Sequence, residues 1–104
     1  MPRSLSLLTV LLLLAGPAFA DGKDDHDRAR AALAAGAVRP LADILADVER
    51  RWIGQVIETE LEHDDGRWVY EFKLLPPSGR IYKLELDATT GALLKSSGPV
   101  LERR

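Results

Sequence analysis

The side chains with the clearest chemical potential are three glutamates that alternate along one segment. Glu58, Glu60 and Glu62 share one face of a predicted strand, with neighbours roughly 7 Å apart. Such a row could supply a glycosidase-type pair of carboxylates, but a general acid also needs an apolar setting that raises its pKa. An open face beside Lys73 and Lys83 offers little of that. We therefore interpret the row as a solvated face and predict no catalytic residue.

The two histidines are weak candidates for a metal site. His26 lies in the aspartate-rich segment 21–27, where nothing fixes a coordination geometry, so a solvated charged tail is the better interpretation. His63 is expected to pack against Trp68 near the end of a hairpin. Because the chain has no cysteine, a structural zinc site is not expected. The sequence predicts no metal and no cofactor.

No serine lies in a setting that would activate it as a nucleophile. Ser78, Ser96 and Ser97 fall in turn-like or terminal segments without a Gly-x-Ser-x-Gly motif. No base can be assigned to any of them. We therefore predict that the protein is not an enzyme.

Four aromatic residues follow a two-residue period or its continuation on the next strand: Trp68, Tyr70, Phe72 and Tyr82. Such a row can line a groove for a small ligand. At strand spacing it is first of all a core that packs against a helix. We favour the core and keep the groove as an alternative.

The N-terminus has the pattern of a secretion signal. Arg3 precedes an uncharged apolar run over residues 5–15, and Ala18–Ala20 offers the small-x-small pattern for signal peptidase. The run is shorter than the roughly 20 residues of a membrane-spanning helix, and Gly16 and Pro17 interrupt it. We predict cleavage between Ala20 and Asp21, a periplasmic or secreted location, and no integral membrane segment afterwards.

Charge and size limit the class of partner. Cleavage removes one of the 14 basic residues and none of the 16 acidic ones, which leaves a formal charge of −3. This mildly acidic balance argues against a nucleic-acid binder, which needs a basic face. A domain this small has modest stability, so a partner or a dimer would help it.

Two helices are expected before the strands. The first spans about residues 27–35 and ends near Gly36. The second begins at Pro40, whose missing N–H costs nothing in the first turn. Its apolar stripe recurs at helical spacing in Leu41, Ile44, Leu45, Val48 and Trp52.

After Gly54 the period changes to two. Segments 56–64 and 67–75 flank Asp65–Gly66, a strong hairpin signal. The two-residue loop sets the predicted pairs Asp64 with Arg67, His63 with Trp68, Leu61 with Tyr70, Thr59 with Phe72, Ile57 with Leu74, and Glu58 with Lys73.

The third strand is expected over residues 80–87, with Phe72 opposite Tyr82 and Glu71 opposite Lys83. A turn follows in which Asp87 accepts from backbone N–H groups, Thr90 precedes Gly91, and Gly91 takes positive φ. A last short strand covers residues 92–96, and the sequence does not decide whether Leu93 or Leu94 points inward.

These elements predict an α+β fold: two N-terminal helices followed by a four-stranded antiparallel meander packed on the second helix. The expected divisions are a signal peptide at 1–20, a charged lead-in and short helix at 21–36, a domain at 37–97 and a tail at 98–104. The predicted core stripe is Leu41, Ile44, Leu45, Val48, Trp52, Leu61, Trp68, Tyr70, Phe72, Tyr82, Leu84 and Leu86.

Three segments, Pro40–Leu45, Gly66–Phe72 and Tyr82–Leu94, resemble the PepSY domain family in the family's order. The last is the most specific, with Asp87 and Thr90–Gly91 before an apolar pair. The resemblance implies an exported α+β module of the kind found in propeptides of secreted metallopeptidases, in membrane proteins and as small free-standing proteins. It brings a structural motif and no catalytic set.

The leading hypothesis is therefore an exported, non-enzymatic protein-binding module that modulates or inhibits peptidases in trans. Its partner would be another exported or membrane-anchored protein, bound along an unpaired edge strand, with the last strand preferred and Val100–Leu101 extending the pairing. One alternative is an accessory protein that contacts the periplasmic part of a membrane sensor. Another is a carrier of a small ligand or metal.

Overall fold

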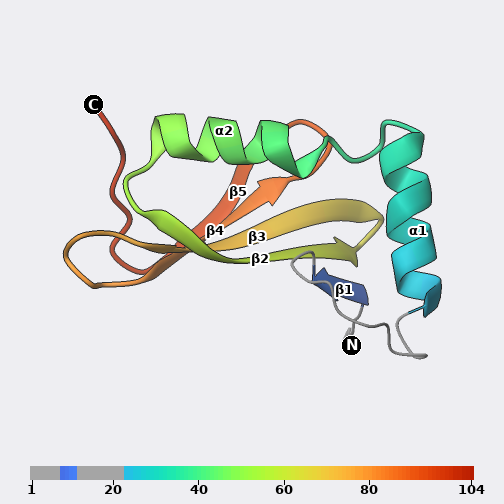
Figure 1. Ribbon diagram of the computed structural model, residues 1–104, viewed down its shortest axis with the longest axis horizontal. Coiled ribbons are helices and arrows are strands. Elements are labelled where there is room, and N and C mark those ends of the chain that lie inside the picture. The colour runs from blue at the N-terminus through green and yellow to red at the C-terminus, as the bar shows by residue number, and fades with distance from the viewer. Residues whose placement is uncertain (1–7, 12–22) are drawn as a thin grey trace.

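A computed structural model describes residues 8–11 and 23–104. Its elements are β1 (Leu8–Leu11), α1 (Lys23–Ala34), α2 (Leu41–Arg51), β2 (Gln55–Asp64), β3 (Arg67–Leu75), β4 (Tyr82–Asp87) and β5 (Leu93–Ser97). The strands form one antiparallel sheet in the order β1-β2-β3-β4-β5, and α2 lies along one face of it (Figure 1). The fold is α+β. The four predicted strands are present in meander order as β2–β5, and Leu8–Leu11 of the predicted signal adds a further strand beside β2.

Helix α2 forms where the apolar stripe was expected. Pro40 occupies its N-cap position, and Arg50 and Arg51 lie in the last turn, where positive charge favours the helix dipole. The stripe faces the sheet: Ile44 and Val48 have no exposed surface. Burial of this one side, rather than helix propensity alone, holds α2 in place.

The β2–β3 hairpin turns at Asp65–Gly66, whose φ angles are 53° and 73°. Positive φ at both positions is the geometry of a type I′ turn, whose twist matches that of the flanking strands. The predicted pairs from Asp64–Arg67 to Thr59–Phe72 are confirmed, and so is Glu58 opposite Lys73. The predicted pair of Ile57 with Leu74 is wrong. A bulge between Val56 and Glu58 places Val56 opposite Leu74 instead.

The predicted register between β3 and β4 is wrong by two residues. Phe72 lies opposite Leu84, not Tyr82, and Lys83 lies opposite Lys73, not Glu71. The strand begins at Tyr82 rather than at residue 80, so the connection after β3 is longer than assumed. Because a two-residue shift preserves the side of each residue, Tyr82, Leu84 and Leu86 still face the core.

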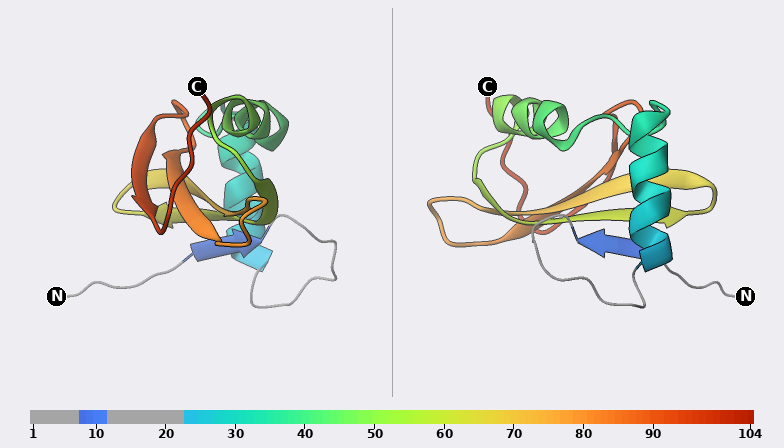
Figure 2. Two further views of the ribbon diagram at one scale, coloured as in Figure 1. Left: turned by 90° about the vertical axis from the view of Figure 1, so that its left-hand side faces the viewer. Right: turned by 45° about the vertical axis from the view of Figure 1, so that its right-hand side comes forward.

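Helix α1 lies across the end of the sheet, as the two views in Figure 2 show. It begins at Lys23, earlier than the expected residue 27. Its buried residues are small: Ala29 and Ala32 join the core, whereas Leu33 remains 44% exposed. The packing of α1 is therefore light compared with that of α2.

Val100–Leu101 was expected to extend the pairing of the last strand, but the C-terminal segment takes another course. It returns to the α2–β2 connection, where the N–H of Ile53 donates to the carbonyl of Leu101 at 2.8 Å. The N–H of Arg103 donates to the carbonyl of Arg51 at 2.8 Å. The tail thus closes the far end of the domain and leaves the outer edge of β5 uncovered.

Candidate functional site

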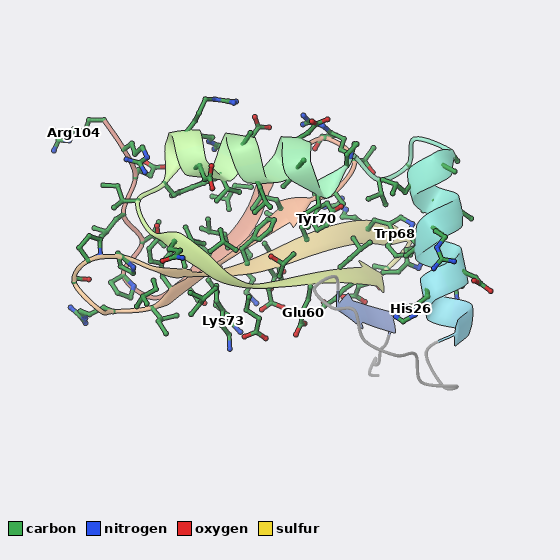
Figure 3. All side chains as sticks on the ribbon, in the orientation of Figure 1. His26, Glu60, Trp68, Tyr70, Lys73 and Arg104 are labelled. Atoms are coloured by element: carbon green, nitrogen blue, oxygen red, sulfur yellow. The ribbon has the colours of Figure 1, made fainter. Side chains whose placement is uncertain are left out.

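The sheet has two chemically different faces. Tyr70 points toward α2, whereas Glu60 and Lys73 project from the opposite side (Figure 3). We call that opposite side the outer face. It carries most of the charged residues of β2, β3, β4 and β5, among them Glu58, Glu60, Glu62, Glu71, Lys73, Lys83, Glu85 and Lys95. The difference follows from strand alternation, which sends successive side chains to opposite faces.

Ion pairs across strands organise the outer face. Lys73 Nζ lies 3.1 Å from Glu58 Oε1, and Lys83 Nζ lies 3.1 Å from Glu71 Oε2. The second pair is diagonal, because Lys83 stands directly opposite Lys73. The bond to Glu71 raises the pKa of Lys83. These pairs are partly exposed, so each contributes little to stability.

Three carboxylates of this face lie close together. Oxygen atoms of Glu60, Glu62 and Glu71 are all within 4.8 Å of one another, a group that a cation could join. Partial burial raises the pKa of Glu60 and of Glu62, and the neighbouring charge of Glu71 raises both further. Glu60 stands opposite Glu71, as the register of the predicted hairpin requires. The closeness of Glu62 depends on side-chain conformation and was not predicted from the sequence.

The hollow beside these carboxylates is open and polar. It measures about 160 Å³ and is lined by Glu58, Glu60, Glu71, Lys73 and Lys83. Within the described residues, two lysines reach into the same hollow and no nucleophile accompanies the carboxylates. A general acid with a raised pKa needs both an enclosed substrate and a second group to act with it. The arrangement therefore resembles a charged recognition surface more than a catalytic centre.

The other candidates for chemistry take structural positions. The rings of His63 and Trp68 are 4.6 Å apart, centroid to centroid, and His26 is half-buried on α1. The Ser78 hydroxyl accepts from the N–H of Arg80 at 3.2 Å, within the β3–β4 connection. Ser96 and Ser97 are exposed on β5.

The aromatic row lies mostly in the core. Tyr70, Phe72 and Tyr82 are at most 2% exposed. Burial raises the pKa of Tyr70 to about 12, and its hydroxyl donates to the carbonyl of Arg39 at 3.0 Å. The remaining core-stripe residues are buried (Ile44, Val48, Trp52, Leu61, Leu84, Leu86) or partly buried (Leu41, Leu45, Trp68).

The turn between β4 and β5 is built around Asp87. Its Oδ1 accepts from the N–H groups of Thr89 at 2.8 Å and Thr90 at 3.1 Å. Gly91 has φ of 84°, which favours glycine, and donates to the carbonyl of Asp87. Sequence reasoning missed Arg39, whose Nη1 lies 3.4 Å from the carbonyl of Thr90 and so joins this turn to α2.

The edge formed by β5 is exposed along its whole length. All five of its residues are exposed, including Leu93 and Leu94 at 38% and 39%. Leu93 stands opposite Leu86 and a bulge follows at Leu94, so neither leucine is buried. An exposed edge offers unpaired backbone groups to another strand.

A helix packed on an antiparallel meander defines a small α+β module. The family model described as "PepSY: Peptidase propeptide and YPEB domain" matches residues 40–96, more than half of the chain. The chain belongs to the PepSY family. No curated protein and no solved structure matches it. PepSY domains are associated with peptidase propeptides and with regulation, and they are generally non-catalytic.

Two expectations about location remain predictions. The cleavage position between Ala20 and Asp21 lies outside the described residues. None of the described helices has the length and apolar character that a membrane span requires. PepSY domains occur in exported proteins, which agrees with the signal pattern.

Proposed function

We propose that this chain is an exported, non-enzymatic module that binds another polypeptide and modulates a peptidase in trans. The observation that carries the proposal is the exposed edge strand β5 on a PepSY domain. Cleavage between Ala20 and Asp21 would release the mature chain, with residues 37–97 as the binding domain. Among residues 23–104, the charged hollow is open and the aromatic row is packed in the core, which supports binding at the sheet edge over a small-molecule site.

The direction of the backbone groups supports binding of an added strand at β5. The N–H of Ala88 donates to Trp68 on β3 at 2.9 Å, and the N–H of Asp87 donates to Ala92 at 2.8 Å, on the β5 side. In an antiparallel ladder these directions alternate along the strand. The backbone N–H and C=O of Glu85 therefore point toward β5. Those of its partner Lys95 point toward β4.

By the same alternation, the N–H and C=O of Ser96 point away from β4 and outward. An extended peptide from a partner can pair with these groups as an added strand. Pro99 follows shortly after and has no N–H, so pairing is confined to the strand itself. The C-terminal tail turns away to Ile53 and leaves this edge open.

The test combines site-specific photo-cross-linking with a substitution that removes one backbone N–H. A photoreactive residue at position 94 of the chain, expressed in its native host, is expected to capture a specific exported protein. The same residue at the exposed Ala46 on α2 serves as the control. Ser96→Pro removes the outward N–H and should abolish the adduct, because proline is tolerated on edge strands but cannot donate. Ser96→Ala keeps the N–H and should retain it.

Two results would overturn the binding mode: equal adducts from positions 94 and 46, or an adduct that Ser96→Pro does not weaken. The peptidase role has its own readout. If the captured protein is a peptidase, the purified chain should lower or alter its activity, and Ser96→Pro should remove that effect. Capture of a membrane sensor instead would overturn the peptidase role and leave the binding module standing.

A further inference from the structure

The opposite edge of the sheet is covered by a segment of the chain itself. Strand β1 pairs antiparallel with β2, with Leu8 opposite His63, Thr9 opposite Glu62, Val10 opposite Leu61 and Leu11 opposite Glu60. This segment belongs to the predicted signal. Buried residues between Ala29 and Ala88, Leu61 of β2 among them, form a core cluster. The β2 edge accepts an extended strand through backbone pairing.

The hairpin fixes which backbone groups of β2 face that edge. Asp64 and Arg67 flank a two-residue type I′ turn, so they form a hydrogen-bonded pair. Bonding direction alternates along β2, so Glu62 and Glu60 also bond toward β3. The N–H and C=O groups of Leu61 and His63 consequently point outward, toward Val10 and Leu8.

The side chains along the same stretch of β2 set a preference for charge. Glu60 and Glu62 belong to the outer face, together with Glu71. The ion pairs of Lys73 and Lys83 on this face are made with Glu58 and Glu71 rather than with Glu60 or Glu62. The residues that β1 places opposite them are Leu11 and Thr9, which carry no charge. Carboxylates crowded in this way favour a cation in the facing position.

The other two positions of the stretch prefer apolar partners. Leu61 is 3% exposed and belongs to the core cluster, while His63 packs against Trp68. A facing residue at either position lies on the same side of the sheet as the core. The β2 edge therefore prefers a bound strand whose side chains are apolar on the side of α2 and positively charged on the side of the outer face.

We propose that residues 60–63 of β2 bind an extended segment of a partner protein in which apolar residues alternate with lysine or arginine. Strand β1 is then an internal occupant that blocks the site until the leader is removed or displaced. The inference rests on the proposed function only in assuming that the chain binds polypeptides. It uses the other edge of the sheet and carries its own test.

The test uses the full chain and a labelled six-residue peptide of alternating valine and lysine, with binding followed by fluorescence anisotropy. Val10→Pro removes the N–H that faces Leu61 and should release β1. Thr9→Pro is the matched control, because the N–H of Thr9 points away from β2. The peptide is expected to bind the Val10→Pro chain at least tenfold more tightly than the Thr9→Pro or unchanged chain.

A second peptide, with glutamate in place of lysine, tests the charge preference. Each partly exposed ion pair contributes up to about fivefold. The lysines that face Glu60 and Glu62 should therefore favour binding several-fold over glutamates at the same positions. The double variant Glu60→Gln/Glu62→Gln should remove most of this difference. Amide hydrogen exchange at Leu61 and His63 should be faster in Val10→Pro and slow again when the lysine peptide is added.

Three results would overturn the proposal: equal peptide affinity for all three chains, equal binding of the two peptides, or unchanged exchange at Leu61 and His63. Far-ultraviolet circular dichroism verifies that both proline variants are folded. These outcomes are independent of cross-linking at β5. If the peptides fail while the β5 adduct persists, only the inference about β2 is lost.

Discussion

The inner and outer faces of strands β2 to β4 are made from alternate residues of the same segments, yet they have opposite characters. On the inner face Phe72, Leu74 and Leu84 have no exposed surface. On the outer face Lys73 and Glu58 keep 40% and 41% of their side-chain surface exposed while forming an ion pair. The inner face therefore supplies most of the stability, since apolar burial dominates folding.

The outer face is free to vary in charge without loss of the fold, because partly exposed ion pairs contribute little. Substitutions on the outer face and along the sheet edges can therefore change which partner is bound, while the core remains unchanged. The difference between the faces predicts a ranking of mutational effects, from truncation of a core side chain down to neutralisation of a surface carboxylate.

The largest effect is expected from Phe72→Ala on the inner face. Removal of a fully buried phenylalanine should lower the free energy of unfolding by about 3–5 kcal/mol. Its neighbour on the same strand provides the control: Lys73→Ala should cost less than about 1 kcal/mol. Urea unfolding followed by circular dichroism measures both. If Phe72→Ala does not fold, Phe72→Leu gives a smaller graded loss, and equal losses on the two faces would contradict the comparison.

An intermediate effect is expected where the inner face is tied to the C-terminal tail. The Tyr82 hydroxyl donates to the carbonyl of Ile53 and lies 3.3 Å from that of Leu101. Tyr82→Phe should lower the free energy of unfolding by about 1 kcal/mol, since a partly buried acceptor loses its donor. Hydrogen exchange at Ile53 and Arg103 should become faster.

Tyr70→Phe is the control for that variant. Its hydroxyl bonds to Arg39, away from the tail, so a similar loss of stability should leave exchange at Ile53 and Arg103 unchanged. If both variants accelerate exchange in the tail equally, the tail is not held through Tyr82.

The smallest effect is expected on the outer face and depends on pH. Burial and the neighbouring carboxylates raise the pKa of Glu60 in the folded state above the ordinary value of 4.5. The folded chain therefore binds this proton more tightly than the unfolded chain, and stability falls as pH rises from 4.5 through the folded-state pKa. Glu60→Gln should stabilise the protein at pH 7 by less than about 1 kcal/mol, with the gain vanishing below pH 4.5.

Glu58→Gln provides the matched comparison, because it removes the ion-pair partner of Lys73 and relieves only a smaller part of the repulsion on Glu60. It should stabilise the protein at pH 7 less than Glu60→Gln does. Urea unfolding of the three chains between pH 4 and pH 8 distinguishes the two cases. Loss of stability in Glu60→Gln at pH 7 would mean that the crowded carboxylates are compensated in a way that the distances do not show.

Local signals were sufficient for much of this fold. Asp65–Gly66 fixes its hairpin because two residues leave one register, and the pairs from Asp64 to Thr59 follow from it. The faces of β4 were also predictable, since alternation survives a shift of two residues. The register between β3 and β4 was not predictable, because the connection between Leu75 and Tyr82 is long enough to allow several registers.

The elements that sequence reasoning missed depend on contacts between distant segments. The pairing of Ile53 with Leu101 and the link from Arg39 to Thr90 join residues about 50 positions apart. Strand β1 was interpreted only as part of a signal, because an apolar run carries no sign of an edge that accepts it. In the candidate site, opposition of Glu60 and Glu71 followed from the hairpin, whereas the approach of Glu62 depends on packing.

The most direct test of the central claim, that this PepSY chain acts by binding another polypeptide along β5, is amide hydrogen exchange with and without the protein captured at position 94. We predict that the partner slows exchange at Ser96 and its neighbours in β5, while exposed amides at the start of α2 remain unchanged. Protection confined to α2, with β5 exchanging as in the free chain, would contradict the account.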